Sequence, residues 1–233
     1  MKKRVTMKTI KQTFRIVTDD CERLKEETYK KIADAARTCY QSENNSSKDA
    51  DIRLIKNLIN NHHEAMLEHA SVTVVFTTDR GITHEIVRHR LASFAQESTR
   101  YCRYSDSKFG DSITYIDIKD ALEIDPVTSK LDVETKMRIV NEWMKACNDA
   151  EEHYKRMIDL GCSPQMARSV LNNSTKSELV VTANIREWRH ILSLRAVGST
   201  GKPHPQMIEL MQPLLKEFQQ IMPELFADLS LDK

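Results

Sequence analysis

The sequence predicts an α+β fold with more helix than strand. Gly and Pro are scarce, at 5 and 6 of 233 residues, which argues against a loop-rich or disordered chain. Apolar residues recur at helical spacing over several long stretches. Two short stretches, residues 71–78 and 178–183, are instead rich in β-branched residues, which is typical of strands. The length suits a single domain spanning residues 1–233.

The first third of the chain alternates between the two kinds of pattern. Residues 5–17 alternate loosely and are rich in Thr, Val and Ile, which favours one or two strands. Residues 21–40 and 50–61 each carry an apolar stripe at helical spacing, and two aspartates can cap the first of these helices. Residues 71–78 (SVTVVFTT) give the clearest strand, and residues 79–81 form the turn that follows it.

The middle of the chain is predicted to be mostly helical. A short helix is expected over residues 82–90 and a strand over 113–118. Residues 133–160 form a long helix, which Gly161 ends. A Ser-Pro pair then begins a further helix at residues 164–171, with the serine as cap and the proline at the first helical position.

The last part of the chain predicts one strand and two helices. Residues 178–183 (ELVVTA) form the strand, and residues 184–196 form a helix directly after it. A loop with two glycines and two prolines separates this helix from the final one at residues 206–229. Pro213 and Pro223 are expected to kink that final helix.

The composition argues against several classes of protein. The net charge of +1 gives no global sign of a nucleic-acid binder. The five cysteines are odd in number, widely spaced and without a CxxC pair, which indicates reduced thiols rather than a disulfide framework or a zinc site. The basic start lacks the apolar run of a signal peptide, and no stretch is long and apolar enough to span a bilayer. We expect a cytoplasmic protein without a membrane or nucleic-acid partner.

Residues 82–104 concentrate positive charge in this nearly neutral chain. The basic side chains are His84, Arg88, His89, Arg90, Arg100 and Arg103. Aromatic and hydroxyl residues lie between them, and arginine forks with hydroxyl donors suit a phosphate group. Two other interpretations remain: a nucleic-acid-binding module that uses the same run, and a structural helical protein in which the run is a solvated face.

The spacing within this run carries a resemblance to a known family. Arg88-His89-Arg90, seven residues and then Ser98 match the RHR-x7-S signature of the flavin-dependent thymidylate synthases. Further blocks agree in order and spacing: His63-Glu64 with Glu68-His69, Met166-Ala167-Arg168, and Asn184-Ile185-Arg186 through Leu194-Arg195. The chain departs from the usual residues at Ala65, Glu85, Gln96 and His190.

The resemblance implies an activity and a fold. Members of this family methylate dUMP to dTMP with methylene-tetrahydrofolate as carbon donor and with FAD, reduced by NADPH, as hydride carrier. The implied fold is a central, mainly antiparallel sheet flanked by long helices. The implied assembly is a homotetramer with FAD sites at subunit interfaces, where Asn184, Arg186 and His190 reach the cofactor from another subunit.

The resemblance also implies roles for individual residues. The implied FAD-binding residues are His63, Arg88, His89, Arg90, Gln96, Asn184, Arg186 and His190. The implied dUMP-binding residues are Glu85, Arg88, Gln96, Glu97, Ser98, Thr99, Arg100, Arg168 and Arg195. Among them Arg195 is the catalytic candidate, because a fixed cation beside the uracil would favour ionisation at its N3.

Two other kinds of chemistry are not expected. Ser98 lacks a GxSxG elbow and an evident His–Asp pair, so we do not expect a nucleophile. The histidines around Glu64 suggest a metal, but His63 and His69 are six residues apart and would face apart on a helix. We therefore expect no metal site.

Overall fold

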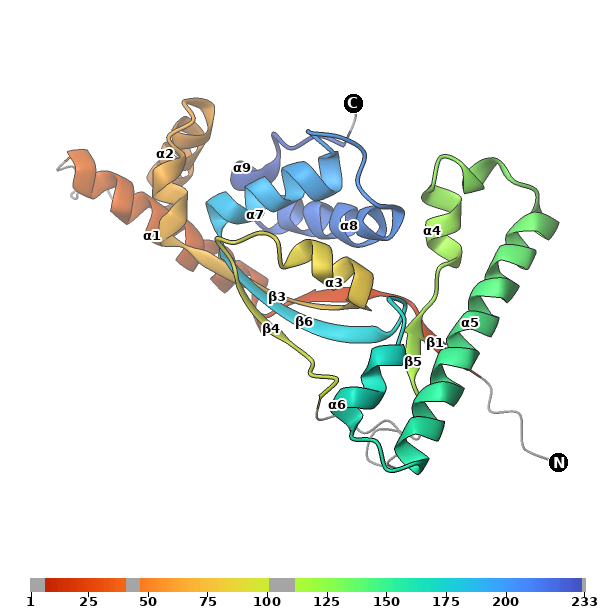
Figure 1. Cartoon of the computed structure of the whole chain (residues 1–233). Helices are drawn as coiled ribbons and strands as arrows, with labels where there is room; N and C mark the ends of the chain where they lie inside the picture. Colours follow the sequence, from red (N-terminus) through yellow and green to blue (C-terminus); the bar gives the residue numbers. More distant parts are fainter. Residues whose placement is uncertain (1–6, 41–46, 101–111, 232–233) are drawn as a thin grey trace. The chain divides into compact units, whose positions relative to one another are not determined.

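The chain forms two compact units. A computed structural model describes residues 7–40, 47–100 and 112–231 (Figure 1). Unit 1 takes its described residues from Met1–Thr13, Phe76–Arg88 and Ala95–Leu179, and unit 2 from Phe14–Val75, His89–Phe94 and Val180–Lys233.

A four-stranded sheet has the order β2 (Thr13–Ile16), β3 (Ser71–Asp79), β6 (Lys176–Asn184), β4 (Ser93–Gln96). Strands β3 and β6 are antiparallel, because the backbone of Ile185 bonds to Ala70 while Thr182 bonds to Thr73. A separate pair, β1 (Lys8–Ile10) and β5 (Thr114–Ile116), is parallel. The predicted α+β fold with a mainly antiparallel sheet is confirmed.

Unit 1 is organised around the long helix α5 (Val133–Asp159), which lies along β5 in Figure 1. A buried cluster joins the two: Ile113, Tyr115, Cys147, Tyr154, Ile158 and Ala167. The Tyr115 hydroxyl donates to the Cys147 carbonyl at 2.8 Å, so this aromatic side chain is buried without an unmet polar group. The other helices that the structure describes in this unit are α3 (Arg80–Ile86), α4 (Lys119–Ile124), η3 (Thr128–Lys130), α6 (Pro164–Ala167) and η4 (Arg168–Val170).

Unit 2 is mostly helical. Its helices are α1 (Cys21–Tyr40), α2 (Lys48–Asn60), the 3-10 helix η1 (Glu64–His69), α7 (Ile185–Leu192), the π-helix η5 (Ser193–Val197), α8 (Pro205–Ile221) and α9 (Pro223–Phe226). Trp188 of α7 is fully buried, packs edge-on against Phe218, and donates from its indole nitrogen to the Val72 carbonyl at 2.9 Å. A buried ion pair between Arg37 and Asp51 ties α1 to α2 at 2.5 Å.

Several predicted elements differ in extent from the structure. The helix expected over residues 82–90 ends at Ile86, so Arg88, His89 and Arg90 follow the helix instead of lying on it. Strand β4 begins at Ser93, three residues after Arg90, and was not predicted. The helix expected over residues 164–171 has only one α-helical turn, and the final helix is divided in two at Met222, just before Pro223. No helix within the described part of the chain is long and apolar enough to cross a membrane.

Candidate functional site

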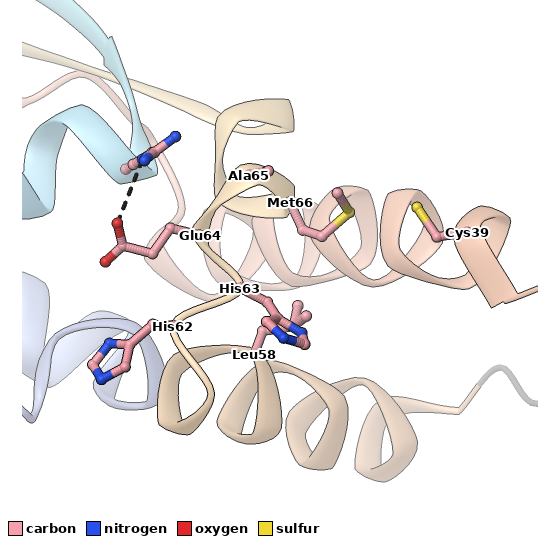
Figure 2. A pocket seen from close by; sticks show the side chains of 8 residues that line it. Cys39, Leu58, His62, His63, Glu64, Ala65 and Met66 are labelled. Atoms are coloured by element: carbon pink, nitrogen blue, oxygen red, sulfur yellow. Dashed lines mark ion pairs between the residues drawn. The ribbon is translucent and has the colours of Figure 1, made fainter.

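A cavity of unit 2 lies at the ends of α1, α2 and α7. Its volume is about 390 Å³, within the usual range for small-molecule sites. Its lining residues are Cys39, Leu58, His62, His63, Glu64, Ala65, Met66 and Arg186 (Figure 2). The cavity therefore brings together two of the predicted FAD-binding residues, His63 and Arg186.

The turn between α2 and η1 places His63 in this cavity. His62 adopts a left-handed conformation at φ 55°, which is uncommon outside glycine, and the chain reverses there. His63 then occupies the N-cap position of η1 without a capping hydrogen bond, and its side chain points between α1 and α2, close to Leu58 (Figure 2). The neighbouring Glu64 pairs with Arg186 at 3.4 Å, as the dashed line in Figure 2 marks, and Arg186 also donates to Glu68 at 2.6 Å.

A second cluster of unit 2 is centred on His89. The Nε of Arg195 donates to Nε2 of His89 at 3.2 Å, while Oε1 of Glu187 lies 3.5 Å from Nδ1. The ring of His190 meets that of His89 edge-on at 5.9 Å. Burial, together with the nearby charges of Arg195 and His190, lowers the pKa of His89 to about 4, so the imidazole is neutral at pH 7.

The local backbone places these side chains around His89. Asn184 caps α7, and its side-chain oxygen accepts from the Glu187 backbone N–H at 2.8 Å. Arg195 lies in the π-helix η5, a wider turn that shifts the side chain relative to a regular helix. Gly198 ends this π-helix at φ 78°, a conformation that glycine adopts without strain.

A third cluster belongs to unit 1 and joins β4 to the start of β6. The Gln96 amide donates to Thr83 at 2.9 Å and to Ser177 at 3.1 Å. Lys176 bonds to the Glu97 carboxylate at 2.9 Å, and the carboxylate also accepts from the backbone of Glu178. The Glu97 side chain is thereby held in place at the end of β4.

The segment after β4 contacts Arg168, one of the predicted dUMP-binding arginines. Arg168 donates to the buried Thr99 hydroxyl at 3.2 Å. The Ser98 hydroxyl accepts from the backbone N–H of Arg100 at 3.3 Å. This is a local turn contact and not a contact with a general base that would activate a nucleophile. The structure thus brings Thr99 and Arg168 together, with Ser98 and Arg100 beside them. A guanidinium with several hydroxyl and backbone donors suits an anionic oxygen ligand such as a phosphate.

Three other predicted residues lie on or just after α3. Arg88 and Arg90 are exposed after α3, and Glu85 is half-buried on that helix. Arg103, the last basic residue of the segment 82–104, lies outside the described residues.

Sequence reasoning missed two residues that the structure places in the clusters. Glu187 lies three residues after the cap residue Asn184, and this spacing is a known signal for a helix start. Lys176 pairs with both Glu97 and Glu178. Burial lowers the pKa of Lys176, but the two carboxylates raise it by more, so the pKa lies above its usual value. Nothing in the local sequence connects Lys176 to the predicted site, since Glu97, its partner in that site, is 79 residues away.

Comparisons with known proteins agree on one family. The family model described as thymidylate synthase complementing protein matches residues 23–224. A flavin-dependent thymidylate synthase of Mycobacterium avium is 30% identical over 204 residues, covering 84% of this chain and 78% of that protein. One from Geobacter sulfurreducens is 32% identical over 172 residues, covering 70% of this chain and 67% of that protein.

Solved structures share the fold. A UMP/dUMP methylase, PolB, from Streptomyces cacaoi, bound with 5-Br dUMP, aligns with a TM-score of 0.76 at 24% identity. The alignment covers 95% of this chain and 96% of that one. The fold similarity therefore extends over nearly the whole chain, and the family model covers most of it. This chain belongs to the flavin-dependent thymidylate synthase family.

Proposed function

We propose that the chain converts dUMP to dTMP, with methylene-tetrahydrofolate as carbon donor and with FAD, reduced by NADPH, as hydride carrier. The observation that carries the proposal is the family match over residues 23–224, which includes all the predicted site residues. The hydrogen bonds from Arg195 to His89 and from Arg168 to Thr99 support it, because each joins two residues of the predicted FAD and dUMP sites.

The cavity of unit 2 fits part of a flavin. Leu58 and Met66 provide apolar walls for a planar ring, while His63 and Arg186 provide polar edges. FAD would also need partners for its pyrophosphate, and Arg88 and Arg90 are exposed arginines with suitable chemistry. When bound, the reduced flavin supplies the hydride that completes the methyl group.

The residues of the chain would bind and polarise the substrate. Arg168, Thr99 and Arg100 would hold the dUMP phosphate through charge-assisted hydrogen bonds. Arg195 would face the uracil and stabilise the negative charge that develops at N3. Its guanidinium is held by a neutral histidine, so His89 adds no competing positive charge beside the base.

The assembly and the compartment belong to the same proposal. We propose a single flavin-dependent thymidylate synthase domain over residues 1–233 that acts as a cytoplasmic homotetramer, with FAD at the subunit interfaces. Two lining residues of the cavity, His63 and Arg186, are exposed in the isolated chain, so a second subunit could contact a flavin bound there.

The first test is the visible absorption spectrum of the purified protein, before and after addition of FAD. Flavin bands that stay with the protein through gel filtration, followed by dTMP formation on addition of NADPH, dUMP and methylene-tetrahydrofolate, are the expected result. A protein that retains no flavin in either sample and forms no dTMP would contradict the proposal. Salt-dependent binding to RNA or DNA by such a flavin-free protein would instead favour the nucleic-acid interpretation.

Ser98→Ala is expected to lower dUMP use while leaving measurable turnover. The hydroxyl contributes one hydrogen bond near the substrate, and loss of such a bond costs about 1 kcal/mol, or roughly fivefold in kcat/KM. Steady-state kinetics with varied dUMP measure the effect. Complete loss of turnover in a folded variant that still binds dUMP would instead indicate a nucleophilic serine.

A further inference from the structure

The buried carboxylate of Glu187 contacts the imidazole that holds Arg195. His89 stands between them: its Nε2 is 3.2 Å from Nε of Arg195, and its Nδ1 is 3.5 Å from Oε1 of Glu187. The side chains of His89 and Glu187 are each only 6% exposed. A carboxylate, an imidazole and a guanidinium therefore form a continuous row that starts in the core of unit 2.

The proton positions along this row follow from the chemistry of the groups. A guanidinium can only donate hydrogen bonds, so Nε2 of His89 must be the acceptor. A neutral imidazole carries one N–H, which is then at Nδ1 and faces Glu187. Burial and the charges of Arg195 and His190 keep the ring neutral, since together they lower the pKa of His89 to about 4. Only one tautomer of His89 is compatible with the contact to Arg195.

We propose that Glu187 is a positioning residue for Arg195. By facing Nδ1–H, it selects the His89 tautomer whose Nε2 accepts from Arg195, and this fixes the guanidinium through its Nε. The terminal nitrogens of the guanidinium are then turned toward the substrate; this last step rests on the function proposed above. The same arrangement occurs in metal sites and catalytic triads, where a carboxylate fixes the tautomer of the histidine that binds the metal or transfers the proton.

A purely structural role for Glu187 predicts different behaviour. Glu187 is the third residue of α7, where a glutamate commonly accepts from the backbone of the cap residue, here Asn184. In that role its loss would weaken the start of the helix without any dependence on His89 or Arg195. The two roles can be separated by a pair of variants and a double-mutant cycle.

The kinetic experiment compares Glu187→Gln with Glu187→Leu in the full-length, flavin-loaded protein. Gln retains an oxygen that can accept from Nδ1–H and is expected to keep most of the turnover, whereas Leu is expected to lower kcat/KM for dUMP about 10- to 100-fold. Adding Glu187→Leu to Arg195→Ala is expected to cause little further loss, because both act through the same guanidinium. Full additivity of the two losses would overturn the proposal.

A second measurement does not depend on activity. Nitrogen-15 NMR of labelled histidines distinguishes the Nδ1–H from the Nε2–H tautomer, and His89→Gln identifies the signals of His89. The wild type and Glu187→Gln are expected to show the Nδ1–H form, and Glu187→Leu a loss of that preference. An unchanged tautomer in Glu187→Leu would overturn the proposal, and this result is readable even if the chain forms no dTMP.

Glu151→Leu provides the matched control. Glu151 is a comparably buried glutamate, with its side chain 8% exposed against 6% for that of Glu187, but it lies on α5 in unit 1. Its replacement is expected to change the melting temperature without changing the His89 tautomer or the KM for dUMP. If this control lowered kcat/KM as strongly as Glu187→Leu, the loss would reflect a general cost of removing a buried carboxylate, and the proposal would be wrong.

Discussion

Replacing Arg195 with Ala is expected to lower dTMP formation about 10²- to 10³-fold while flavin stays bound to the protein. This is the range measured when one fixed donor to a developing negative charge is removed from an active site. The fall should appear in kcat as well as in kcat/KM, because the charge on the uracil develops mainly in the transition state. Stopped-flow and steady-state kinetics with dUMP, together with the flavin absorbance of the purified variant, measure both parts.

Arg195→Lys tests whether the orientation of Arg195 by His89 matters in addition to its charge. Lysine keeps the positive charge but has a single donor nitrogen, so it cannot keep a separate Nε contact to Nε2 of His89 while two further nitrogens face the uracil. We expect an intermediate loss of turnover. If Lys were as active as Arg, the charge alone would suffice and the orientation by His89 would be unimportant.

A surface arginine serves as the control for Arg195. Arg138 on α5 pairs with Glu134 at 2.9 Å, and both side chains are about three-quarters exposed, at 76% and 78%. Such an exposed pair contributes little to stability, so Arg138→Ala should match the wild type in turnover and flavin content. Turnover of Arg195→Ala at the level of this control would remove Arg195 from the mechanism.

The sequence predicts the parts of the fold that depend on local pattern. The strand over residues 71–78 is observed as β3 (Ser71–Asp79), since β-branched residues suit its half-buried position. The long helix over residues 133–160 is observed as α5 (Val133–Asp159), with Asp132 as its cap and Gly161 beyond its end at φ 91°. Each of these signals lies within a few residues of the element that it predicts.

The parts that were missed depend on contacts between distant residues. Strand β4 (Ser93–Gln96) has only four residues, and it is defined by pairing with β6, about 80 residues later. The π-helix at Ser193–Val197 has no sequence signature of its own. For the same reason the motifs predicted His89 and Arg195 as separate site residues, but not that one bonds to the other, 106 residues away.

Gly198→Ala is expected to impair both stability and turnover, because the chain has no room for a methyl group there. An added Cβ would lie 2.9 Å from the Gly201 carbonyl oxygen, closer than such atoms approach, and 3.0 Å from Cδ of Pro203, which is a tight contact. The left-handed conformation at φ 78° adds a penalty of about 1–2 kcal/mol for any residue other than glycine. With the overpacking, we expect a loss of about 2–4 kcal/mol in the free energy of unfolding.

Gly161→Ala separates the cost of the left-handed conformation from the cost of overpacking. Gly161 has a similar conformation, at φ 91°, but an added Cβ would meet nothing within 4 Å. Its replacement should therefore cost only the conformational penalty and leave turnover unchanged, since it lies at the end of α5. Chemical denaturation compares the stabilities of the two variants, and dUMP kinetics below their transitions compare their activities.

The difference between the two glycine variants tests whether the end of the π-helix holds Arg195. To relieve the contact with the Gly201 carbonyl, the backbone at Gly198 or at Gly201 must shift, and Arg195 in η5 is only three residues before Gly198. A displacement of about 1 Å at a catalytic group costs on the order of 100-fold in rate. Gly198→Ala should thus lose turnover well beyond Gly161→Ala at temperatures where both are folded. Equal turnover in the two variants would mean that Arg195 is held by other contacts, with the His89 bond as the first candidate.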